Sequence, residues 1–342
     1  MPTFTSVHQA GRFLWGRHAF GFRENPPADE HANFFRAVMA IANADGAISD
    51  SEKSFAKASA VMNNVFFKDF DDICNEIEKG DVQAGIDEAA DQLQATDVLR
   101  NHGIRPTIYY AALIAGQDSI AVKEREALCA LAKKLNLADH DVSHLIDVAS
   151  REVDLLREKV KLLFPSGSRY HTEATQSYKT IEEACRGYWC YIIFGMTETP
   201  SPGLTTAIIR ASLSVAAADG ALSDEEVSHA SAAAIVTGLS RKEFNQFIKK
   251  LNTSPDKLDL ASKLLQDLPD EFRAAALYYA AHVAATDSFN TAEMEALKEV
   301  GTKMGFDPQY LSRIMEMVSR EGELHDEKVK ANFPRGGPYH AN

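Results

Sequence analysis

The chain has 342 residues, of which 45% are hydrophobic and 25% are charged, the balance of an ordinary globular protein. Its formal net charge of −13 argues against a nucleic-acid-binding protein, because such proteins need a basic face. No apolar run reaches the roughly 18 residues that a membrane-spanning helix requires, and the 4 cysteines form no CxxC pair. We therefore expect a cytoplasmic protein with reduced thiols and no transmembrane segment, whose field attracts cations or basic partners.

The chain contains two copies of one sequence pattern. The segment AIANADGAISDSE over 40–52 returns as SVAAADGALSDEE over 214–226, at an offset of 174 residues. Further along, YYAALIAGQDS over 109–119 returns as YYAAHVAATDS over 278–288, at an offset of 169 residues. Such self-similarity indicates an internal duplication.

Both copies have the pattern of helices throughout. Apolar residues recur at helical spacing in segments such as 34–44, and no segment sustains the alternation that is typical of a strand. We therefore predict an all-α protein of two tandem domains, over 1–175 and 180–342, with about six to seven helices each. The polar residues 172–179 would join them.

An acidic turn separates two predicted helices early in copy one. Asp45 and Gly46 end the first helix, and Ser49 and Glu52 begin the next one with the Ser-x-x-Glu spacing of a capping box. In this arrangement the serine and glutamate side chains satisfy backbone N–H groups that the helix leaves without partners. We expect a short turn between two antiparallel helices.

A second acidic turn follows in the same copy, as a weaker echo of the first. It contains Asp118 and Glu124, and an apolar helix over 127–137 comes after it. We expect the two helix–turn–helix hairpins to be related and their acidic residues to approach one another. Copy two carries the equivalent acidic residues of both turns, which are Asp219, Glu226, Asp287 and Glu293.

These features resemble the TerB family, which is named for tellurite resistance. The resemblance rests on the Ala-Asp-Gly turns at 44–46 and 218–220, on the capping boxes, and on the later aspartate turns that precede an apolar helix. Copy two departs from the pattern at Gly301, where the family has alanine. The resemblance implies two TerB-like all-α domains, a role in the response to chemical stress, and binding of divalent metal by acidic turn residues.

The metal prediction depends on the two turns of each copy facing one another. A hard cation such as Ca²⁺ takes about six to eight oxygen ligands, which two hairpins could supply and one could not. The metal would be calcium, manganese or zinc, and the candidate ligands are Asp45, Glu52, Asp118, Glu124, Asp219, Glu226, Asp287 and Glu293. The alternative interpretation is that these residues only cap helices and close turns.

Motifs of enzymes are absent from the sequence, which has no phosphate-binding loop, nucleophile elbow or HExxH. We therefore expect a non-enzymatic stress-response protein that binds divalent metal and acts with protein partners of a stress-response complex. The alternative function is a metal-free helical scaffold that docks other proteins, including at a membrane surface. The segments around Trp15 and Trp189 could serve such a surface, although docking onto their own domains is the interpretation that we favour.

Overall fold

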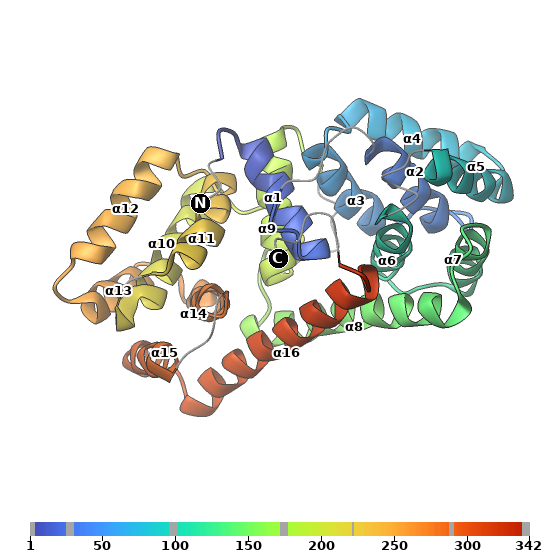
Figure 1. The fold of residues 1–342 in the computed structure, drawn as a ribbon. Coiled ribbons are helices and arrows are strands. Elements are labelled where there is room, and N and C mark those ends of the chain that lie inside the picture. Colours follow the sequence, from blue (N-terminus) through green and yellow to red (C-terminus); the bar gives the residue numbers. More distant parts are fainter. Residues whose placement is uncertain are drawn as a thin grey trace. The chain divides into compact units, whose positions relative to one another are not determined.

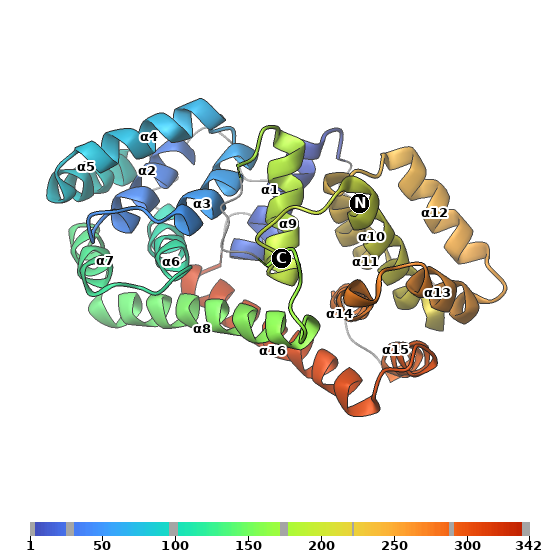
Figure 2. The same ribbon diagram turned by 180° about the vertical axis from the view of Figure 1, so that it is seen from behind.

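The computed structural model describes residues 4–24, 31–95, 102–171, 177–220, 222–286 and 291–336. Within these ranges the chain forms sixteen α-helices, a 3₁₀ helix and no β-strand, which confirms the predicted all-α class (Figures 1 and 2). None of the described helices combines the length and the apolar character that crossing a membrane would require. The four cysteines, all of which are described, form no disulfide.

Eight α-helices lie in each half of the described chain, one or two more than predicted. The first half contains α1 (Val7–Phe20), α2 (His31–Ala42), α3 (Asp50–Met62), α4 (Phe67–Lys79), α5 (Val82–Ala95), α6 (Ile104–Ala115), α7 (Val122–Lys134) and α8 (Asp139–Leu163). The second half contains α9 (Ile181–Phe194), α10 (Pro202–Ala216), η2 (Ala217–Asp219), α11 (Asp224–Val236), α12 (Arg241–Thr253), α13 (Lys257–Gln266), α14 (Asp270–Ala284), α15 (Thr291–Lys303) and α16 (Pro308–Asn332). One extra helix arises because Gly80 takes an extended backbone conformation, which ends α4 before α5 begins.

The helices pack as two compact units, and each unit draws on both halves of the chain. Unit 1 comprises Met1–Leu14, Leu156–Ala174 and Cys185–Glu323. Unit 2 comprises Trp15–Leu155, Thr175–Ala184 and Leu324–Asn342. The division passes through α1, α8, α9 and α16, so each of these helices contributes to both units. The boundaries of the predicted domains come from the sequence repeat, whereas the boundaries of the compact units come from the contacts between residues.

Aromatic clusters form the core of each unit. In unit 2 the apolar helix α2 packs against α5 and α6, and the Trp15 ring lies 5.0 Å from Phe20 and 5.9 Å from Tyr110. In unit 1 α10 packs against α13 and α14, and the Trp189 ring lies 5.3 Å from Tyr279. Both tryptophans are buried, which confirms their docking within the protein and leaves neither indole exposed to a membrane surface.

Gly301, where copy two departs from the family pattern, lies on the face of α15 that packs against α16. A Cβ atom at this position would lie 2.6 Å from Cδ2 of Leu311. The glycine is therefore explained by the close approach of the two helices, since alanine would force Leu311 to move.

A buried lysine links α8 to α16 within unit 1. Lys159 Nζ donates hydrogen bonds to the Glu321 carboxylate at 2.7 Å, to the Ile192 carbonyl at 3.0 Å and to the Tyr278 hydroxyl at 3.3 Å. The Tyr278 hydroxyl in turn donates to Glu321. Only 3% of the Lys159 side chain is exposed, so this charge depends on its partners.

The same three residue types recur in unit 2. Lys328 Nζ donates to both oxygens of Glu152 at 3.1 Å, and the Tyr109 hydroxyl donates to Glu152. These three residues stand at an offset of 169 from the residues of the first network. Each unit thus holds a segment of α8 and a segment of α16 together through one buried ion pair.

Candidate functional site

The first acidic turn of copy one joins α2 to α3 through a complete capping box. The Ser49 backbone N–H donates to Glu52 Oε2 at 2.7 Å, and the Glu52 N–H donates to Ser49 Oγ at 3.3 Å. Before it, Asp45 Oδ1 accepts the Ala47 N–H at 3.1 Å, and Gly46 takes a positive φ of 106°. The predicted turn and capping box are confirmed.

The second acidic turn joins α6 to α7 in a similar way. Glu124 Oε2 accepts the Ala121 N–H at 2.6 Å, while Asp118 Oδ1 accepts the Ser119 N–H at 2.8 Å. Ala121 stands where the first turn has a serine, so the second helix start retains the glutamate half of the capping arrangement. The second turn thus repeats the placement of one glutamate at a helix start and one aspartate before it.

The two turns bring Glu52 and Glu124 together inside unit 2. Their carboxyl groups are close enough for their charges to act on one another, and the residues are only 2% and 3% exposed. Burial raises the pKa of Glu52 to about 8 and the pKa of Glu124 to about 7. The negative charge of Asp118 raises both pKa values further, and Asp45 adds to the effect on Glu124. Near neutral pH the pair therefore retains a proton.

One oxygen of this pair lacks an ordinary hydrogen-bond donor. Glu52 Oε1 is buried and receives no hydrogen bond from an N–H or hydroxyl group of the described residues. Such an oxygen can be satisfied by a proton held between the carboxyl groups or by a cation. The capping boxes do not neutralise the negative charge of the pair. A proton or a cation must therefore do so.

The remaining candidates of copy one lie at the surface. Asp45 and Asp118 are exposed, and each caps its own turn. Across the described parts of the chain, no group of three or more His, Cys, Asp or Glu residues is arranged to hold a metal ion. The structure therefore places two predicted ligands, Glu52 and Glu124, next to one another. It leaves Asp45 and Asp118 at the surface.

Copy two repeats the first half of this arrangement. Glu226 is 3% exposed, and its Oε2 accepts the Ser223 N–H at 2.6 Å in a second complete capping box. Glu293 lies half-buried in the first turn of α15. Asp287 and the side chain of Asp219 lie outside the described residues. Copy one is therefore the copy in which the acidic residues of both turns are described.

Sequence reasoning missed a pair of histidines in unit 1. The rings of His229 and His282 lie 5.5 Å apart, beside the buried ring of Tyr279. In the aligned repeat these positions are Phe55 and Leu113. The replacement of two apolar residues by two histidines was the signal in the sequence that could have identified them.

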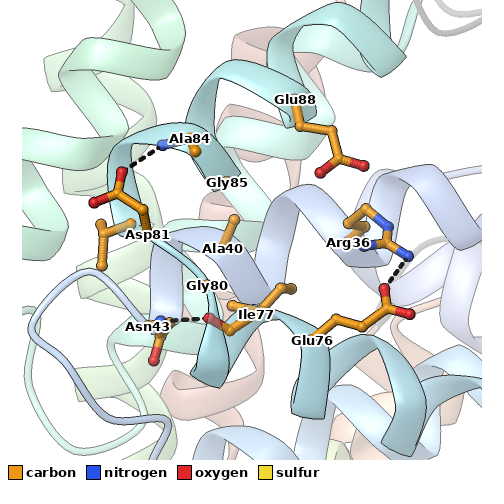
Figure 3. A pocket seen from close by; sticks show the side chains of 11 residues that line it. Arg36, Ala40, Asn43, Glu76, Ile77, Gly80, Asp81, Ala84, Gly85 and Glu88 are labelled. Carbon is orange, nitrogen blue, oxygen red and sulfur yellow. Dashed lines mark hydrogen bonds and ion pairs between the residues drawn. The ribbon is translucent and has the colours of Figure 1, made fainter.

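A small pocket of about 270 Å³ lies between α2, α4 and α5 in unit 2 (Figure 3). Arg36 pairs with Glu76 at 2.8 Å at one end, and Asn43 donates to the Ile77 carbonyl at 3.2 Å. Asp81 caps the start of α5. These polar groups are engaged with one another, so the pocket does not add a ligand set to the carboxylate pair.

Comparisons with known proteins give one similarity. No family model and no curated protein matches the chain. Among solved structures, the chain is similar to a tellurite resistance protein from Nostoc punctiforme, with a TM-score of 0.40 and 19% sequence identity. The match covers 47% of this chain and 100% of that chain. The all-α class and the carboxylate pair rest on the structure of the chain itself.

Proposed function

We propose that this chain is a TerB-like stress-response protein that binds a divalent cation at the paired acidic turns of copy one. The observation that carries the proposal is the buried contact between Glu52 and Glu124, with Glu52 Oε1 lacking a donor. The sequence resemblance supports the family and the stress setting. An equivalent site in copy two would use Glu226 and Glu293.

The chemistry of the pair favours a hard cation. Two carboxyl groups in contact cannot both ionise in a buried site unless a positive charge joins them. Each glutamate holds a backbone N–H through Oε2 and has its other oxygen left for a ligand role. Oxygen ligands without a histidine or cysteine suit calcium or manganese better than zinc.

The exposed aspartates would complete the site. Asp45 and Asp118 lie on the turns that precede the two glutamates, and their charges already act on the pair. Rotation of these side chains toward the glutamates, together with bound water, would raise the number of oxygen ligands toward that of a calcium site. We therefore expect binding to order the two turns.

Calorimetric titration tests the proposal on full-length protein purified without an affinity tag or chelator. Calcium, manganese and zinc are added separately at about pH 6 and about pH 8. Because the cation displaces the shared proton, we expect tighter binding at the higher pH and measurable proton release. Elemental analysis of the purified protein gives an independent measurement.

Matched variants separate ligand binding from helix capping. Glu52→Gln preserves the capping box, since glutamine also serves there, but removes a charged ligand. Asp45→Asn keeps the turn preference. Both should lose the rise in melting temperature that the metal produces. Glu243→Gln is the control, because Glu243 forms a capping box with Ser240 on the exposed surface.

The scaffold function predicts a different result. If the acidic residues only cap helices, added metal should leave the melting temperature of the parent and of each of the three variants unchanged. That result, together with no heat of binding for any of the three metals, would remove the metal site and leave the scaffold as the explanation of the fold.

A further inference from the structure

A second cavity, of about 980 Å³, lies in unit 1. It is bordered by the C-terminal end of α8, the first turn of α14 and the corner between α15 and α16. Phe164, Ala274, Phe306 and Tyr310 contribute apolar surface, and the rings of Phe306 and Tyr310 stack at 5.6 Å. Its volume is at the upper end of the range for ligand pockets, about 300–1,000 Å³.

Acidic groups dominate the charged lining of this cavity. Asp270, Glu271 and Asp307 contribute three carboxylates, against the single guanidinium of Arg313, which lies over the Tyr310 ring at 5.4 Å. Asp270 pairs with a neighbouring arginine, whereas Glu271 and Asp307 form no ion pair within the described ranges. The lining therefore favours a cationic ligand.

The aligned corner of copy one contains an arginine of the chain itself. At an offset of 169 residues, Ala274 corresponds to Arg105 and Tyr310 corresponds to Asp141. In unit 2 the Arg105 guanidinium pairs with Asp141 and donates to the Ala331 carbonyl at 3.0 Å. Copy one thus fills this place with its own arginine side chain.

Copy two has a different hydrogen-bond donor at the aligned corner. The carbonyl of Leu162, which aligns with that of Ala331, accepts a hydrogen bond from the Tyr310 hydroxyl at 2.7 Å. Tyr310 thus takes over the carbonyl contact that Arg105 makes in copy one, and Ala274 lies in the cavity wall beside it. The acidic lining is a feature of copy two, since Glu271 and Asp307 align with His102 and Ala138.

We propose that this cavity binds an arginine side chain from a basic segment of a partner protein. The guanidinium would lie against the partly exposed ring of Phe306 and pair with Glu271 and Asp307, in the two modes that arginine uses best. The cavity exceeds the volume of one side chain, so it also accommodates residues next to the arginine. The net charge of −13 steers a basic segment toward the protein.

Binding of a matched pair of peptides tests the proposal on the full chain. The probes are acetyl-Gly-Phe-Arg-Gly-amide and the same peptide with citrulline, which keeps the shape of arginine but carries no charge. We expect the arginine peptide to bind about tenfold more tightly, since hydrogen bonds to charged groups are the stronger ones. Agmatine is a third probe. Its binding as tightly as the peptide would retain the guanidinium chemistry but overturn a partner protein as the source.

Two variants locate the binding in the cavity. The double variant Ala274→Arg, Tyr310→Asp copies the filled corner of copy one and should abolish peptide binding. Glu271→Gln is the milder variant, and it should weaken the arginine peptide several-fold while leaving the citrulline peptide unchanged. Glu295→Gln, on the exposed surface of α15, is the control for charge and should leave both peptides unchanged.

Circular dichroism spectra establish that each variant is folded before binding is compared. Equal affinity for the arginine and citrulline peptides would overturn the proposal. So would unchanged arginine-peptide binding by Glu271→Gln and the folded double variant. Neither result bears on the metal site, which lies in unit 2 and is measured with different probes.

Discussion

The contact between Glu52 and Glu124 makes the stability of the metal-free protein depend on pH. Both pKa values are raised above the ordinary glutamate value of 4.5, to about 8 and about 7. Between pH 4.5 and these raised pKa values, the folded chain binds more protons than the unfolded chain. The free energy of unfolding must therefore fall as the pH rises through this window.

The magnitude follows from the number of protons retained. If the pair keeps one extra proton in the folded state, the free energy of unfolding changes by about 1.4 kcal/mol for each pH unit. From about pH 5 to about pH 7 the pair should thus remove about 3 kcal/mol of stability. This is a large fraction of the stability of an ordinary domain, about 5–15 kcal/mol.

Urea unfolding in the presence of a chelator measures this effect. The double variant Glu52→Gln, Glu124→Gln keeps both helix starts but cannot ionise, so its stability should depend less on pH than that of the parent by the amount given above. The parent-minus-variant difference cancels the contribution of other groups, such as His171, whose pKa burial lowers. Parallel pH profiles for parent and variant would refute the reasoning.

Two further predictions concern packing and are measured by urea unfolding. Lys159→Met leaves a partner carboxylate without its buried cation and should cost about 3–5 kcal/mol, whereas Arg320→Met breaks a half-exposed pair and should cost less than about 1 kcal/mol. Gly195→Ala should destabilise more than Gly46→Ala, because both have positive φ but only at Gly195 would the new Cβ lie 2.2 Å from Val160 Cγ2. Equal costs within either pair would contradict the corresponding prediction.

The all-α class and the helix starts could be predicted because they depend on local sequence. The Ser-x-x-Glu spacing at Ser49 and Ser223 produces a capping box in the structure at both positions. The division into units could not be predicted in the same way. α8 and α16 each have 25 residues and the pattern of ordinary amphipathic helices, and which segment packs in which unit depends on contacts far apart in the sequence.

The buried lysines illustrate the same limit. Lys159 and Lys328 are charged residues on long polar helices, where a solvated position is the usual expectation. Their burial arises from glutamate and tyrosine partners that are distant in the chain. The sequence shows that a lysine, a glutamate and a tyrosine recur at the same offset. This recurrence does not predict that the three side chains contact one another.

The acidic candidates divide by burial, which the sequence did not distinguish. Glu52 and Glu124 are buried at the starts of α3 and α7, while Asp45 and Asp118 remain at the surface. From the sequence, helix capping and metal binding were alternative roles for these acidic residues. In the structure one carboxylate oxygen of each glutamate caps a helix, so the cap fixes the position from which the other oxygen could bind a cation.

The charges around the pair bear on the proposed binding of a divalent cation. The N-termini of α3 and α7 each contribute about half of a positive charge, so together they offset about one of the two glutamate charges. A proton offsets the other in the metal-free protein, because burial raises the pKa of both glutamates. The exposed aspartates then add two negative charges that solvent partly screens. A divalent cation in place of the proton would neutralise the pair and draw the aspartates inward, so affinity should fall when either an aspartate or a glutamate loses its charge.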